Sequence, residues 1–180
     1  MRKLILQLAV SLDGFIEGPN GEYDWCFTDQ DYGMTDFLNR VDSMLLGRKS
    51  YELTQSMGEE AMAPFSKLTP YIVSTTLPGV KEGEILIKEN AEEAVKELKN
   101  AQGKDIWLFG GASLTTSMFN AGLIDEIILA VHPVILGRGK PLFTNINNRT
   151  ALTLKDATTY NSGLVMLTYT LASATAQANH

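Results

Sequence analysis

The pattern that decides the fold of this chain lies in one stretch, Asp105-Ile106-Trp107-Leu108-Phe109-Gly110-Gly111-Ala112-Ser113-Leu114. Its apolar run, residues 106–109, has no polar alternation, which is typical of a strand buried on both faces. After the two glycines, Leu114 and Met118 recur at helical spacing, and Gly122 stands where a helix C′ glycine is expected. The stretch therefore predicts a strand that turns through glycines into a helix.

Such a turn is a physical site for a phosphate or a pyrophosphate. The first backbone N–H groups of a helix have no partner within the helix, and they lie at the positive end of its dipole. The alternative is a tight strand–helix turn with nothing bound, because glycine pairs such as Gly110-Gly111 are common in turns. Features elsewhere in the chain favour the phosphate interpretation.

Composition and charge exclude several classes of protein. The 180 residues suit one domain, and 44% apolar with 20% charged residues is an ordinary globular composition. A net charge of −6 argues against a nucleic-acid partner. The single cysteine, Cys26, cannot form an internal disulfide, and no set of ligands predicts a metal site. No apolar run approaches membrane-spanning length, so we expect a cytoplasmic protein without a membrane partner.

Strand and helix patterns alternate along the chain. Besides residues 106–109, strands are expected over 3–10, 43–46, 71–74, 84–87 and 126–131, with an antiparallel pair over 151–160 and 164–171. Helices are expected over 29–40, 48–53 and 90–102, with Asp29 and Asn90 as N-caps. This order predicts an α/β domain with a mostly parallel central sheet and an antiparallel C-terminal hairpin. We expect one domain over residues 1–172 and a frayed tail over 173–180.

Ligands of such sheets bind beyond the carboxyl ends of the strands, and four of the expected strand ends carry small, hydroxyl or basic residues. Arg48 and Lys49 follow a strand and open a helix together with Ser50. Two cations at a helix N-terminus suit a terminal phosphate such as the 2′-phosphate of NADPH, although solvated surface cations are the alternative. A Rossmann dehydrogenase is not expected, because Ser11-Leu12-Asp13-Gly14 occupies the place of its glycine motif.

Four motifs in order carry a family resemblance over nearly the whole chain. They are Ser11-Leu12-Asp13-Gly14-Phe15-Ile16, Leu45-Leu46-Gly47-Arg48-Lys49-Ser50-Tyr51-Glu52, Phe109-Gly110-Gly111-Ala112-Ser113-Leu114 and Pro133-Val134-Ile135-Leu136-Gly137-Arg138-Gly139. The sequence resembles the dihydrofolate-reductase-like superfamily, in particular the C-terminal reductase domain of the bifunctional riboflavin-biosynthesis deaminase-reductase. The resemblance implies the three-layer α/β fold of that superfamily, NADPH as cofactor, and a homodimer.

The resemblance also implies where the cofactor binds. The adenosine phosphate is expected at Gly47, Arg48, Lys49 and Ser50, and the adenine side is expected beside Ser74 and Thr75. The diphosphate is expected at Gly110, Gly111, Ala112, Ser113 and Leu114. The nicotinamide is expected beside Ala9, Val10 and Ile16.

Candidates for catalysis and for substrate contact are fewer. The implied chemistry is hydride transfer to a C=N-type bond, with a proton from an acid or from water. Alignment from Gly47 suggests Asp31 as the acid that contacts the substrate, or Asp29 with a gap of one position; both are also ordinary acids for the first turn of a helix. Asp13 is the other candidate, or simply part of an Asp-Gly turn. Trp25 could stack on a substrate ring or close its loop onto the core.

Two departures from the family pattern bear on the substrate. The chain has no deaminase motifs, so we expect a stand-alone reductase. Residues 54–64 are acidic and carry no cation, whereas the riboflavin reductases typically have a basic segment there for a ribose phosphate. The sequence thus predicts an NADPH-dependent reductase of a pyrimidine- or pterin-like, phosphate-free small molecule. The alternatives are a nucleotide-binding or sensor protein of the same fold without efficient turnover, and a protein that holds a flavin or another nucleotide.

Overall fold

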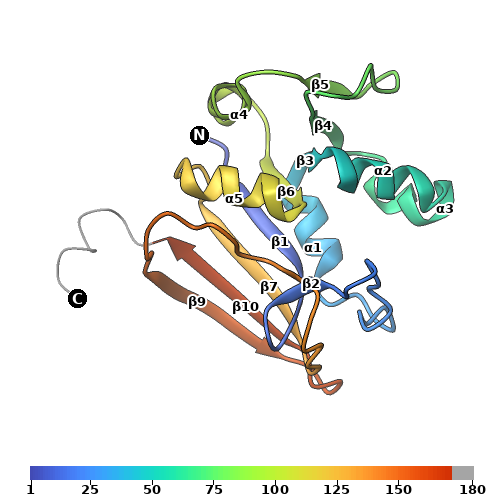
Figure 1. The fold of residues 1–180 in the computed structure, drawn as a ribbon, viewed down its shortest axis with the longest axis vertical. Helices are drawn as coiled ribbons and strands as arrows, with labels where there is room; N and C mark the ends of the chain where they lie inside the picture. The colour runs from blue at the N-terminus through green and yellow to red at the C-terminus, as the bar shows by residue number, and fades with distance from the viewer. Residues whose placement is uncertain (172–180) are drawn as a thin grey trace.

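A computed structural model describes residues 1–171 of the chain; the expected tail, residues 173–180, lies outside the described residues. An eight-stranded sheet forms the centre, in the order β5-β4-β3-β6-β1-β7-β10-β9 (Figure 1). Its strands are β1 (Leu4–Ser11), β3 (Val41–Gly47), β4 (Thr69–Val73), β5 (Ile85–Ile87), β6 (Asp105–Gly110), β7 (Glu126–His132), β9 (Leu152–Thr159) and β10 (Val165–Leu171). The first six pair in parallel, whereas β10 runs antiparallel to both β7 and β9. The expected mostly parallel sheet with an antiparallel C-terminal hairpin is confirmed.

Helices cover both faces of the sheet and make three layers (Figure 1). They are α1 (Met34–Arg40), α2 (Arg48–Ser56), α3 (Glu59–Met62), α4 (Ala91–Asn100) and α5 (Ala112–Asn120), with a 3-10 turn at Ala63–Phe65. Alternate residues of β1 explain the two cores. Leu4 packs in the core with Val95 of α4 and Met118 of α5, whereas Ile5 packs in the core with Phe37 of α1.

A second, two-stranded sheet pairs β2 (Phe15–Glu17) with β8 (Lys140–Pro141) in antiparallel fashion. Neither segment is among the strands expected from the sequence. Strands of three and two residues are too short to show a periodicity, and here they exist because two distant segments meet. A Cβ on Gly139 would lie 2.2 Å from the carbonyl oxygen of Glu17, so this approach requires a glycine.

One expected helix start was wrong, and one expected N-cap lacks its capping hydrogen bond. Helix α1 begins at Met34 and not near Asp29, because Tyr32 and Gly33 have φ values of 49° and 78°, which interrupt a right-handed helix. Asn90 precedes α4 as expected, but its φ is 51° and its side chain makes no capping hydrogen bond. The expected end of α5 is confirmed, since Gly122 has a φ of 66° and its N–H donates to the carbonyl of Phe119.

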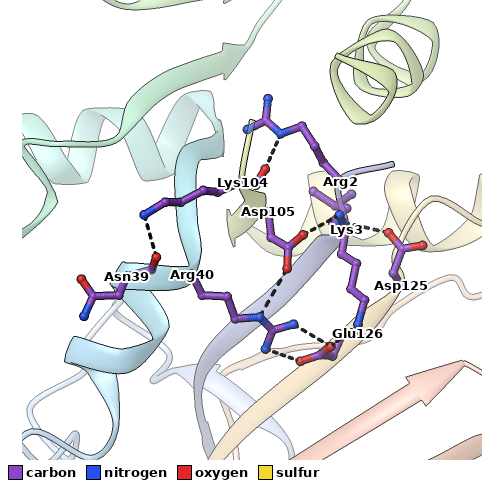
Figure 2. A network of polar contacts seen from close by, with 9 residues as sticks. Arg2, Lys3, Asn39, Arg40, Lys104, Asp105, Asp125 and Glu126 are labelled. Atoms are coloured by element: carbon purple, nitrogen blue, oxygen red, sulfur yellow. Dashed lines mark hydrogen bonds and ion pairs between the residues drawn. The ribbon is translucent and has the colours of Figure 1, made fainter. Parts of the chain in front are cut away.

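Charged side chains close the amino ends of the central strands (Figure 2). Arg40 at the end of α1 donates to both carboxylate oxygens of Glu126, at 2.7 and 2.8 Å, and Lys3 lies 3.3 Å from the same carboxylate. The pKa of Glu126 is lowered: burial opposes its ionisation, but the hydrogen bonds and charges of Arg40 and Lys3 outweigh burial. This end of the sheet is a structural junction, which leaves the carboxyl ends of the strands for ligands. No helix within residues 1–171 is long and apolar enough to cross a membrane.

Candidate cofactor and substrate site

A cleft of about 450 Å³ lies beyond the carboxyl ends of β3 and β6. Two of the sequence motifs meet in it, although they are far apart along the chain. Its lining consists of Gly47, Arg48, Lys49, Ser50, Val73, Ala91, Gly111, Ala112, Ser113, Leu114, Ser117 and Lys140. The cleft therefore unites the expected adenosine-phosphate segment with the expected diphosphate segment.

Two helix N-termini open into this cleft. Gly47 is the N-cap of α2 and Gly111 is the N-cap of α5, and neither helix has a side-chain cap. The two turns lie side by side, since a Cβ on Gly47 would be 3.7 Å from the backbone nitrogen of Gly111. A Cβ on Gly111 would in turn lie 3.2 Å from Ser50 Oγ. Free N–H groups and positive dipole ends thus converge on one space that only small residues leave open.

Cationic side chains add to this positive end. Arg48, Lys49 and Lys140 all line the cleft. Arg48 Nη1 is 2.9 Å from Glu52 Oε1, one turn further along α2, and both side chains are about half exposed. An exposed pair of this kind is weak and can be exchanged for a phosphate without a large cost. The cleft therefore has the chemistry of a binding site for phosphate groups.

A second, smaller cavity of about 250 Å³ adjoins the cleft and shares Ser50, Gly111 and Lys140 with it. Most of its remaining lining is apolar. These other lining residues are Leu8, Ala9, Ile16, Glu17, Tyr23, Cys26, Leu53, Met57, Phe109, Gly110 and Thr115. A largely apolar cavity beside an anion site is the arrangement expected where a flat ring binds next to a dinucleotide.

Some of the sequence-predicted cofactor residues lie elsewhere. Ala9 and Ile16 line the smaller cavity, but Val10 is only 4% exposed and packs in the core. The Ser74 hydroxyl accepts hydrogen bonds from the N–H groups of Thr76 and Leu77, so it shapes the turn after β4. Thr75 is exposed in that turn and lines neither cavity.

Asp13 joins two loops. Its Oδ2 accepts from the N–H of Gly137 at 2.7 Å, and its Oδ1 accepts from the N–H of Leu136 at 3.1 Å and from the Ser11 hydroxyl at 2.7 Å. The Ser11 hydroxyl, followed by these N–H groups, lowers the pKa of Asp13. Asp13 lines neither cavity, and a carboxylate so well supplied with donors is a poor proton donor at neutral pH.

Asp31 stabilises the approach to α1. Its Oδ1 accepts from the Thr35 hydroxyl at 2.8 Å and from the Thr35 N–H at 3.0 Å, and these bonds lower its pKa. The carboxylate is exposed and lines neither cavity. These contacts are those of an ordinary acid beside the first turn of a helix.

The segment around Trp25 is held by a buried histidine. The rings of Trp25 and Phe27 lie 5.3 and 5.0 Å from that of His132, which is 2% exposed. The His132 Nε2 accepts from the N–H of Phe27 at 3.0 Å, so the other ring nitrogen, 2.9 Å from the carbonyl of Ala130, carries the proton. Trp25 thus packs against His132 at the end of β7, and the same segment presents Tyr23 to the smaller cavity.

The sequence analysis missed two charged residues of the site. Glu17 lines the smaller cavity and Lys140 lines both spaces; the Lys140 Nζ is 2.8 Å from Glu17 Oε1. The strand pairing of β2 with β8 sets them opposite each other. No local pattern marked Glu17, because its setting depends on a loop far along the chain.

The four motifs, the fold and the paired N-termini of α2 and α5 are consistent with one protein family. The family model for the RibD C-terminal domain matches residues 2–166. The chain belongs to the RibD C-terminal domain family. It is 46% identical over 177 residues to the uncharacterized protein YyaP of Bacillus subtilis, which covers 93% of this chain and 94% of YyaP.

Solved structures agree on the fold. A protein from Shewanella sp. PV-4 with a provisional riboflavin-biosynthesis name superposes with a TM-score of 0.84 at 24% identity, over 95% of this chain and 99% of that one. Dihydrofolate reductase from Enterococcus faecalis, solved with NADP(H), superposes with a TM-score of 0.64 at 16% identity, over 95% and 97%. The fold of this RibD-family chain is therefore dihydrofolate-reductase-like, as the sequence analysis expected.

Proposed function

We propose that this protein is an NADPH-dependent reductase of a pyrimidine- or pterin-like small molecule. The observation that carries the proposal is the convergence of the N-termini of α2 and α5, with Arg48 and Lys49, on one cleft beside an apolar cavity. Membership of a reductase family supports the same activity. The Enterococcus faecalis dihydrofolate reductase, which has a similar fold, was solved in complex with NADP(H).

The residues of the cleft fit this cofactor. The uncapped N–H groups after Gly111 would bind the diphosphate, and Arg48 with Lys49 would bind the 2′-phosphate. Ala9 and Ile16 would contact the nicotinamide from the wall of the smaller cavity. When bound, the nicotinamide supplies a hydride, and the reduced C=N bond takes up one proton as well.

The source of that proton is best sought outside the two expected acids. Asp13 and Asp31 are both held ionised by nearby donors, which suits loop structure better than proton donation. Water that enters the partly open cavity is then the simplest proton source. Asp13, Asp31 and Trp25 would act on the reaction only through the loops that they hold.

We also infer a homodimer, built on the C-terminal hairpin. Every residue of β9 is exposed, including Leu152 at 39% and Leu154 at 51%. Their cross-strand neighbours on β10, Leu171 and Tyr169, pack against the core below α5. This apolar face therefore continues past the helices to β9, which has no second neighbour among the described strands (Figure 1), and a second copy would cover it.

A nucleotide-binding or sensor protein of the same fold is the second candidate. It is favoured by one observation: neither of the expected acids, Asp13 or Asp31, lines the cleft or the cavity. Such a protein would bind NADPH and never oxidise it. Consumption of NADPH with candidate heterocycles, followed at 340 nm, separates the two functions. A flavin in the cleft would instead be visible in the absorbance of the purified protein.

The first test is thermal unfolding with NADPH and with NADH. A ligand at about a hundred times its Kd should stabilise the protein by roughly 2.7 kcal/mol. NADPH should raise the Tm of the wild type more than NADH does, and Arg48→Ala should remove that difference. Lys67→Ala is the matched control, because Lys67 is exposed and lines neither cavity. If neither nucleotide changes the Tm, the protein is not an NADPH-dependent reductase.

A further inference from the structure

The smaller cavity carries one pair of charges within a largely apolar wall. Leu8, Ile16, Met57 and Phe109 supply much of this wall, and Lys140 is its one cationic side chain among the described residues. Since Glu17 lies 2.8 Å from Lys140, the pair is neutral as a whole. A cavity of this kind does not suit a phosphorylated substrate, which would meet the Glu17 carboxylate beside the only cation.

The strand pairing fixes this ion pair. Glu17 ends β2 and Lys140 begins β8, and the two residues are direct partners in the antiparallel register. Gly139 packs so closely on the carbonyl oxygen of Glu17 that no side chain fits between them. Both charged side chains are about one-third exposed, at 32% and 33%, so they are accessible to a ligand. The pair is therefore positioned in advance, with little ordering cost on binding.

The two groups leave a particular set of polar atoms free. In the described part of the chain, the contact with Lys140 uses Oε1 of Glu17, and Oε2 has no other protein partner. The Lys140 ammonium has three N–H donors, so a single contact with Glu17 leaves donors for a ligand. An acceptor and a donor thus lie side by side at the cavity wall. This pair is complementary to an amide edge of a ring, in which an N–H neighbours a C=O.

Resting on the reductase function proposed above, we propose that Glu17 and Lys140 are the specificity-determining pair of the smaller cavity, which takes a flat, phosphate-free ring through its CO–NH edge. The ring N–H donates to Glu17, and the ring C=O accepts from Lys140. Glu17 belongs to the smaller cavity alone, whereas Lys140 also lines the cofactor cleft. Glu17 therefore lies apart from the cleft proposed for the cofactor phosphates, so its loss should mainly weaken the ring ligand, whereas loss of Lys140 should weaken both ligands.

The alternative is a salt bridge that only joins β2 to β8. Exposed ion pairs often contribute little to stability, and a purely structural pair would not distinguish between ligands. The experiment must therefore measure recognition of a CO–NH edge. Lumazine (pteridine-2,4-dione) is a suitable probe because it is flat, fluorescent and free of phosphate. Its 1,3-dimethyl derivative has the same ring without the N–H donors.

Fluorescence titration of the NADP-loaded protein should give at least tenfold tighter binding of lumazine than of 1,3-dimethyllumazine; tenfold corresponds to about 1.4 kcal/mol. Glu17→Met should remove this preference while the Kd for NADPH stays within twofold of the wild type. Glu17→Gln, which retains the shape of the side chain, should reduce the preference and guards against misfolding of the Met variant. Asp24→Ala is the control, since Asp24 is an exposed acid of the same loop that lines neither cavity.

The outcomes separate this inference from the reductase function. Equal binding of the two lumazines, no binding of either, or a preference that survives Glu17→Met each overturns the role of the pair, even where NADPH binds normally. The same titration without nucleotide covers the opposite case. In that case NADPH does not bind, but lumazine binds more tightly than 1,3-dimethyllumazine and Glu17→Met removes this preference. Such a result would show that Glu17 and Lys140 recognise the CO–NH edge of the ring in a protein that is not an NADPH-dependent reductase.

Discussion

At the scale of single residues, His132 shows how one buried side chain shapes the wall of the site. Its Nε2 is an acceptor for Phe27, and burial lowers the pKa of the imidazole although the Ala130 carbonyl opposes this. Protonation would destroy the acceptor that anchors the segment carrying Tyr23 and Cys26. The smaller cavity therefore depends on a neutral histidine.

This dependence predicts a loss of stability in mild acid. Below about pH 6.5 the unfolded chain protonates His132 while the folded chain resists, so the free energy of unfolding falls with pH by at most about 1.4 kcal/mol per unit until the folded pKa is reached. Above that window the contribution is complete. Urea unfolding between pH 5.5 and 7.5 should show this slope in the wild type and not in His132→Gln, which retains His180. Equal slopes in the two proteins would contradict the role of His132.

Some residues of the site could be predicted from the sequence alone, and others could not. Gly47 and Gly111 could be predicted as strand–helix turn residues, because each stands between an apolar run and a helical pattern. Glu17 could not be predicted as a residue of the cavity, because its contact with Lys140 forms only through the pairing of β2 with β8. The contacts of Asp13 could not be predicted either, because only the folded chain brings the N–H groups of Leu136 and Gly137 to its carboxylate.

At the scale of elements, the junction of α1 with β7 depends on a polar contact. The Arg40 guanidinium donates to both carboxylate oxygens of Glu126, whose side chain is 6% exposed (Figure 2). Removal of Arg40 therefore leaves a buried carboxylate without these two hydrogen bonds. Lys3 remains within 3.3 Å and compensates in part. We expect Arg40→Met to lower the free energy of unfolding by about 2 kcal/mol, less than for a fully buried pair because the Arg40 side chain is itself 36% exposed.

Chemical denaturation measures this loss. The double variant Arg40→Met with Glu126→Met should recover much of the stability, because both charges are then gone. Lys96→Met is the matched control: its pair with Glu93 is exposed on both sides, and its removal should cost less than about 0.5 kcal/mol. A similar loss for Arg40→Met and Lys96→Met would show that the buried carboxylate does not depend on Arg40.

Elements with their own periodicity were predictable, and those made by distant contacts were not. The run 106–109 and the spacing of Leu114 and Met118 predicted β6 and α5 because each pattern is local. The start of α1 was missed because Tyr32 adopts a positive φ, which residue type alone does not forecast. The pairing of the strands also could not be predicted from the sequence. It is the parallel pairing of β3 with β6 that brings their two glycine turns together.

At the scale of the whole molecule, the layers and the sheet order explain why the two ends of the sheet differ. The carboxyl ends of all the parallel strands lie at one end of the sheet, where the cleft and the smaller cavity are. The charged junction closes the opposite end, at the amino ends of these strands (Figure 2). The antiparallel hairpin then extends the sheet sideways beyond the helices (Figure 1). The hairpin therefore contributes nothing to the lining of the cleft and is free to form a contact between subunits.

The proposed homodimer predicts a change of mass on one substitution. Leu154→Lys places a charge in the apolar face that β9 shares with Tyr169, and burying an unpaired charge between two copies is costly. Analytical ultracentrifugation should give a dimer for the wild type and a monomer for the variant, with the Tm lowered. Thr153→Lys is the control, because adjacent residues of a strand point to opposite faces. A monomeric wild type at tens of micromolar would exclude the dimer, whereas a dimer that survives Leu154→Lys would move its interface away from this face of the hairpin.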